Sequence, residues 1–183
     1  PHDYPPNHVQ ALRAKQQGGV ASYAHPGYRF TSDPDTMSAA ELPVDLALGS
    51  VQAMDVMSNS NEDSSTAYWY RLLNTGLRCA ISAGSDSFTN RRHHWIPGGH
   101  RVYVQTGRAL NAADWVRNYG AGRSFATNGP MLQFRVNGKL PGAELNLKSG
   151  DILRVEASAT SFVPMDKLEI VLNGEVVASV AAS

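Results

Sequence analysis

The sequence predicts an α/β domain followed by a small antiparallel β module with a sandwich-like organisation. Helix-like segments alternate with short apolar, strand-like runs as far as residue 127, and this alternation is typical of a parallel sheet with right-handed crossovers. Beyond residue 128 the helical period disappears and apolar residues alternate with polar ones as in β-strands. Because closing a barrel takes about eight strands, the five expected here would form only part of one.

The first part, residues 1–127, is expected to contain four helices. Apolar stripes mark them, and glycines stop two of them, at residues 18–19 and at Gly76. Asn7 and Asn111 are the expected N-caps, while Pro43 would end a first turn or open a second short helix. The expected helices cover residues 6–17, 38–48, 65–75 and 111–119, and the expected strands cover residues 20–24, 51–54, 79–83, 101–105 and 124–126.

The second part, residues 128–183, begins at the sharp break Asn128-Gly129-Pro130. Asn137-Gly138 and Asn173-Gly174 each lie between strand-like runs, a pattern that strongly favours β-hairpins. We expect four or five antiparallel strands here, with a strand or two missing after residue 183.

Composition excludes some classes of partner. The 183 residues include 16 Lys and Arg against 16 Asp and Glu, so the formal net charge is zero. We therefore expect neither a nucleic-acid nor a membrane partner, and no segment is long and apolar enough to span a bilayer. The single cysteine, Cys79, excludes an intrachain disulfide, and its apolar surroundings predict a buried thiol.

Three strand-like runs lead into residues that can bind a metal. His25 follows the first, Asp55 ends the second with Asn59 just beyond, and Asp86 follows the third. Parallel strands open their C-terminal ends on one face, so these side chains are expected to converge there. One imidazole and two carboxylates suit a divalent ion such as zinc, manganese or iron.

Each residue alone also has a structural interpretation. His25 could hydrogen-bond a loop, and Asp86 could close an Asx-turn. Asp55 lies in an apolar strand, where an unpaired carboxylate is costly, so it could be a ligand or could orient one.

Two further features are candidates for binding a substrate. A long loop carries three histidines and a tryptophan that could cover the site, and one imidazole could supply a ligand; solvated loop residues are the alternative. Arg123 could hold an anionic substrate, or it could be a structural residue at the domain junction. The loop residues are His93, His94, Trp95 and His100.

Six short motifs occur in a fixed order along nearly the whole chain. They are Gly18-Gly19 with Ala24-His25-Pro26, Val51 with Ala53-Met54-Asp55-Val56, Trp69-Tyr70 with Leu72-Leu73-Asn74 and Gly76, Ala83-Gly84-Ser85-Asp86, Arg101-Val102-Tyr103-Val104, and Gly122-Arg123-Ser124-Phe125 with Thr127-Asn128-Gly129-Pro130. This ordered set resembles the CehA/McbA-type metallohydrolases of the PHP (polymerase and histidinol phosphatase) superfamily.

The resemblance implies a PHP-type distorted (β/α) barrel with a metal cluster at the C-terminal ends of its strands. It implies hydrolysis of a phosphoester or, in some members, of a carbamate or other ester. His25 matches the metal-binding His-Pro motif, Asp86 matches the late Asp ligand, and Asp55 aligns with an acidic strand position.

The chain departs from the family in two places. The early His-x-His strand is not found, and Phe88 stands where many members have the histidine of an Asp-x-His motif. The resemblance therefore covers the C-terminal part of the barrel and predicts an incomplete divalent-metal site. We expect a fragment of a metal-dependent hydrolase of small molecules, weakly active or inactive alone, with Asp86 and Arg123 as catalytic residues. A missing N-terminal half or a homo-oligomer would complete it.

Two alternatives remain open from the sequence. The chain could be a non-catalytic binding protein whose β module recognises a glycan or a protein partner, or it could be purely structural. The arrangement of Trp95 and Tyr103 separates the first alternative from an enzyme. An exposed aromatic platform would favour binding, and a position beside His25 would favour catalysis.

Overall fold

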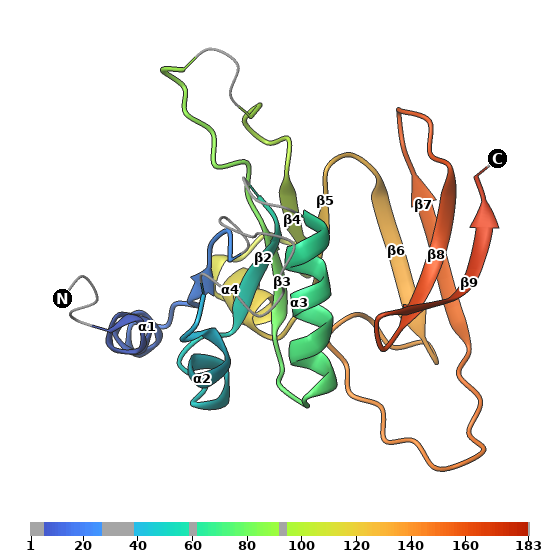
Figure 1. The fold of residues 1–183 in the computed structure, drawn as a ribbon, viewed down its shortest axis with the longest axis horizontal. Coiled ribbons are helices and arrows are strands. Elements are labelled where there is room, and N and C mark those ends of the chain that lie inside the picture. Colours follow the sequence, from blue (N-terminus) through green and yellow to red (C-terminus); the bar gives the residue numbers. More distant parts are fainter. Residues whose placement is uncertain (1–5, 27–38, 59–61, 92–94, 183) are drawn as a thin grey trace.

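A computed structural model describes residues 6–26, 39–58, 62–91 and 95–182. It is a mixed α/β structure in which a small parallel sheet with helices is followed by antiparallel β-hairpins (Figure 1). The described residues form no closed barrel. The α/β class expected from the alternating pattern is therefore confirmed.

The parallel sheet contains β1 (Ser22–Tyr23), β2 (Ala53–Met57) and β3 (Ala80–Ala83), in that order. Ser22 lies opposite Ala53, which in turn lies opposite Ala80, and both pairings are parallel. The register shifts between Asp55 and Met57, so the end of β2 is irregular. Because both pairings are parallel, all three strands end at the same edge of the sheet, called here the C-terminal edge.

The next two strands correct one expectation. β4 (Arg101–Val104) and β5 (Ser124–Thr127) pair antiparallel, whereas the sequence pattern predicted a parallel arrangement throughout. The helix between them returns the chain to the end of β4, because the Asn118 amide in its last turn donates to the Gln105 carbonyl at 2.7 Å. β5 also lies beside β3, where the Ser124 hydroxyl donates to the Ile81 carbonyl at 3.2 Å.

All four expected helices are present, with shifted boundaries. Pro43 lies in the first turn of its helix, where its missing N–H is harmless, and no second short helix follows it among the described residues. Asn111 caps its helix by accepting the Asp114 N–H at 3.1 Å, as expected. Asn7 does not act as an N-cap, because the cap position falls on Pro6. The helices are α1 (Asn7–Gln16), α2 (Leu42–Ala47), α3 (Glu62–Asn74) and α4 (Ala112–Gly120).

Two apolar clusters hold the α/β part together, one on each face of the parallel sheet. The larger packs α1, α2 and α3 against one face, and the smaller packs α4 against the other. The larger cluster includes Ala11, Leu42, Leu46, Val51, Met54, Leu72 and Cys79, and the smaller is built on Ala53, Ala80 and Tyr119.

The C-terminal part forms two antiparallel pairs. β6 (Met131–Val136) pairs with β7 (Val155–Thr160), and β8 (Lys167–Leu172) pairs with β9 (Glu175–Ala181). Both residues of the expected Asn173-Gly174 turn have positive φ, 55° and 91°, as a two-residue hairpin turn requires.

The other Asn-Gly pair behaves differently. Asn137-Gly138 makes a tight turn that pairs Val136 with Lys139 alone, so the hairpin expected to follow it is not formed. The chain instead runs along the α/β part, where the Arg78 guanidinium donates to the Gly142 carbonyl at 3.0 Å. β6 takes the later strand β7 as its partner.

Candidate functional site

The three residues expected to bind metal lie at the C-terminal edge of the parallel sheet. His25 follows β1 by two residues, Asp55 lies in β2, and Asp86 follows β3 by three residues. The backbone N–H of His25 donates to Asp55 Oδ2 at 3.4 Å, which is long for such a bond. The strand ends therefore bring His25 and Asp55 into contact.

His25 and Asp86 share an uncommon backbone conformation. Their φ angles are 33° and 45°, in the left-handed region that non-glycine residues rarely adopt. Within the described ranges, the other two non-glycine residues with positive φ are Asn137 and Asn173, which belong to Asn-Gly turns. Left-handed backbone costs about 1 kcal/mol per residue, and such positions cluster at functional sites.

Asp55 connects the two flanking residues electrostatically. Burial raises the pKa of the Asp55 carboxyl, while hydrogen bonds from the Ser82 side chain and the His25 N–H oppose that rise. The charge of His25 also lowers this pKa, and the charge of Asp86 raises it. The charges of both neighbours thus act, in opposite directions, on one partly buried carboxyl group, which a bound cation would stabilise in its ionised form.

Hydrogen bonds connect Asp55 to two hydroxyl residues that the sequence did not single out, Ser82 and Tyr119. The Tyr119 side chain, 8% exposed at the end of α4, hydrogen-bonds with the side chains of Ser22 and Ser82. Burial raises the pKa of the Tyr119 hydroxyl, so it remains a neutral phenol. Ser82 hydrogen-bonds both Tyr119 and Asp55 and links the site to α4.

The long loop contributes His100 to the same edge. The His100 N–H donates to Ser85 Oγ at 3.2 Å, and Ser85 Oγ donates to the His100 carbonyl at 3.4 Å. Because Ser85 directly precedes Asp86, these contacts place His100 beside the turn that contains Asp86. Trp95 packs on His100 with 5.2 Å between ring centroids. Three other candidates from the sequence, Asn59, His93 and His94, lie outside the described residues.

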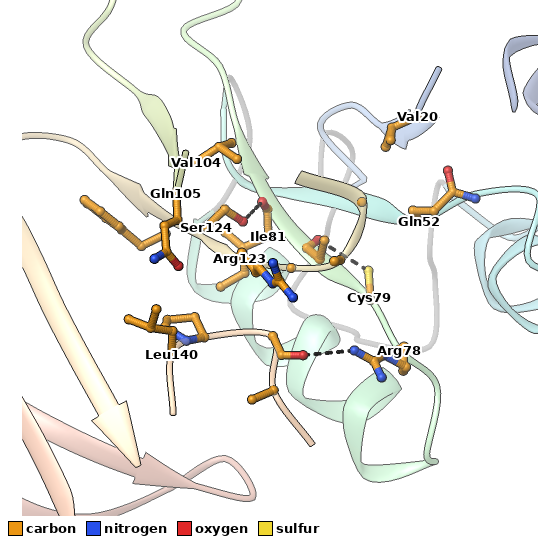
Figure 2. Close-up of a pocket in the computed structure, with 18 of the residues that line it drawn as sticks. Val20, Gln52, Arg78, Cys79, Ile81, Val104, Gln105, Arg123, Ser124 and Leu140 are labelled. Atoms are coloured by element: carbon orange, nitrogen blue, oxygen red, sulfur yellow. Dashed lines mark hydrogen bonds between the residues drawn. The ribbon is translucent and has the colours of Figure 1, made fainter. Parts of the chain in front are cut away.

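The structure does not bring Arg123 to this edge. Arg123 Nη1 donates to Asn118 Oδ1 at 3.1 Å, and the Arg123 N–H donates to the Asn118 carbonyl at 2.9 Å. Arg123 and its neighbours instead line a cavity of about 1250 Å³ at the opposite edge, where β1, β2 and β3 begin (Figure 2). Tyr103, stacked on Phe125 at 5.3 Å, also lines that cavity.

A complete metal cluster is not assembled by the described residues. Within the described ranges, no three His, Cys, Asp or Glu side chains are grouped so that they could hold one metal ion. The donor types at the C-terminal edge, imidazole and carboxylate, nevertheless suit a borderline divalent ion.

Among the residues that the structure describes, no helix is long and apolar enough to cross a membrane.

Comparison with known proteins identifies no protein similar to this chain. No protein-family model, curated protein or solved structure matches the chain.

Proposed function

We propose that this chain is part of a metal-dependent hydrolase that acts on phosphoesters or on related esters and carbamates of small molecules. Residues 1–127 would be the C-terminal part of a PHP-type distorted barrel, and residues 128–183 a sandwich-like module. One observation supports this most strongly: His25 and Asp86 both have positive φ, both lie just beyond parallel strands, and both influence the pKa of the partly buried Asp55 carboxyl, in opposite directions.

His25 and Asp86 would hold the metal together with donors from outside the described residues, and Asp55 would bind the ion or orient one of its ligands. A divalent ion at such a site supplies Lewis acidity to a phosphoryl or carbonyl oxygen and lowers the pKa of water. Ser82 and Tyr119 would hold Asp55 in position from below. Because Arg123 lies at the opposite edge, substrate contact is assigned to the segment that carries Trp95 and His100. An N-terminal half or a second copy of the chain would supply further donors.

Metal binding by the purified chain tests the site. Titration with Zn²⁺ or Mn²⁺ should show weak binding, which His25→Ala and Asp86→Asn reduce at least tenfold. His8→Ala, on the partly exposed face of α1, and Asp166→Asn, in an exposed loop, are matched controls that should bind as the wild type does. Equal metal binding by all five proteins would exclude His25 and Asp86 as ligands.

Activity is best assayed in the longer protein that the proposal implies. That protein should hydrolyse an aryl phosphate or aryl ester in the presence of metal, and Asp86→Ala should abolish turnover. Turnover that survives Asp86→Ala unchanged would reject the assignment.

A non-catalytic binding protein is the second candidate, and the apolar surface of the C-terminal strands favours it. Val176, Val177 and Val180 of β9 are each more than half exposed, and surface of this kind is typical of interaction sites. A chain that bound a glycan or protein partner but no divalent metal would support this candidate over the hydrolase.

A further inference from the structure

His100 is a buried histidine with only one of its two ring nitrogens engaged. Its side chain is 7% exposed, and its Nε2 lies 2.9 Å from Oε1 of Glu62. A carboxylate accepts hydrogen bonds, so Nε2 is the nitrogen that carries the proton in this contact. In a neutral imidazole, the lone pair then lies on Nδ1.

That lone pair is buried without compensation. His100 Nδ1 has no hydrogen-bond partner among the residues that the structure describes. Leaving a buried acceptor unpaired costs about 1–3 kcal/mol, and natural structures rarely leave one so without a functional reason.

The contacts of His100 place this residue beside the candidate metal site. Glu62 opens α3, which follows the end of β2, and the two hydrogen bonds with Ser85 attach His100 to the turn that contains Asp86. Trp95 packs on the imidazole at 5.2 Å. Residues separated by up to 38 positions in the sequence thus meet at the C-terminal edge.

We propose that His100 binds a divalent cation through Nδ1 at this edge, with Glu62 as the positioning residue and Asp86 as a second ligand. A histidine that donates one N–H to a carboxylate and binds metal through its other nitrogen is a common arrangement in metalloproteins. The carboxylate fixes the tautomer and raises the basicity of the ligating nitrogen. The inference rests on the function proposed above, because Asp86 belongs to both sites.

The tautomer can be measured on the wild-type chain, without a variant that could misfold. Long-range ¹H–¹⁵N correlation spectra of the metal-free protein should show His100 as the Nε2–H tautomer. Added Zn²⁺ should shift the Nδ1 resonance of His100 while the His8 ring, on the outer helix α1, stays unchanged. A proton on Nδ1, or an Nδ1 resonance that Zn²⁺ leaves in place, would overturn the proposal.

Variants then separate this inference from the proposed function. His100→Ala should lower Zn²⁺ affinity at least tenfold, and Glu62→Gln should lower it about 10–100-fold while the fold, measured by circular dichroism, persists. His8→Ala is the matched control and should have no effect. If His25→Ala and Asp86→Asn weaken binding but His100→Ala does not, this inference fails and the proposed function stands. If the wild-type chain binds no metal, both fail.

Discussion

Replacing Asp55 by Asn should stabilise the metal-free protein while weakening its metal binding. Burial raises the pKa of this carboxyl despite the opposing hydrogen bonds from Ser82 and the His25 N–H. Since the net shift is upward, desolvation of the ionised group outweighs those bonds in the folded state. Asparagine keeps an oxygen that can accept the His25 N–H and carries no charge, so the variant avoids that desolvation cost.

The sign of the pH dependence follows from the direction of the shift. A carboxyl with a raised folded-state pKa favours folding fully below its unfolded pKa of about 3.9, and that contribution is lost as pH rises through the folded value. Wild type and Asp55→Asn should therefore have about equal free energies of unfolding near pH 3.5. As pH rises above about 4, the variant should become the more stable of the two. We expect a gain of about 1 kcal/mol at pH 7, which is the size that single stabilising substitutions commonly give.

Urea unfolding between pH 3.5 and 8, in the presence of a chelator, measures this difference. With a slope of about 2 kcal/mol per molar urea, the variant's midpoint should rise by about 0.5 M at pH 7. Asp166→Asn, in an exposed loop, should change stability by less than about 0.5 kcal/mol at any pH. A variant less stable than wild type at pH 7, or a difference independent of pH, would refute the reasoning.

Three further predictions follow from packing. Burial raises the pKa of the Cys79 thiol to about 12, so a disulfide reagent at pH 8 should label it only after urea unfolding; rapid labelling of the native chain would contradict this. Asn118→Ala should lower stability by about 2–3 kcal/mol, because it leaves the Gln105 carbonyl without its 2.7 Å donor; a melting temperature within a degree of wild type would count against this anchor. Gly142→Ala should cost more than Gly138→Ala, because both have positive φ but only at Gly142 would a Cβ meet neighbouring backbone, 2.8 Å from a carbonyl carbon; equal thermal unfolding of the two variants would show that this segment does not pack as described.

Local patterns predicted the elements better than they predicted the partners of those elements. The apolar runs before His25, Asp55 and Asp86 became parallel strands, and Asn173-Gly174 became a hairpin turn, because sequence neighbours determine both features. The predicted parallel direction of β4 relative to β5 was wrong, because the direction depends on where the last turn of α4 is anchored. That anchor is the contact between Asn118 and Gln105, 13 residues apart, which no periodic pattern records.

In the candidate site, too, the residues that follow from local sequence could be predicted and those that depend on distant contacts could not. His25, Asp55 and Asp86 could be selected because each lies at a strand end, and parallel strands share an edge. Glu62 lies before the helix expected over residues 65–75, and its pairing with His100 spans 38 residues. Tyr119 was predicted only as the end of the helix over residues 111–119, because nothing in its neighbours along the chain indicates that its hydroxyl hydrogen-bonds Ser82.

The central claim is that the side chains of His25 and Asp86 bind the same cation. A double-mutant cycle of Zn²⁺ affinity, with His25→Ala, Asp86→Ala and the double variant measured by calorimetry, tests it most directly. If both residues hold one ion, each single change costs at least tenfold, or about 1.4 kcal/mol, and the double variant loses clearly less than the sum. Strictly additive losses, or single variants that bind zinc as the wild type does, would contradict the account.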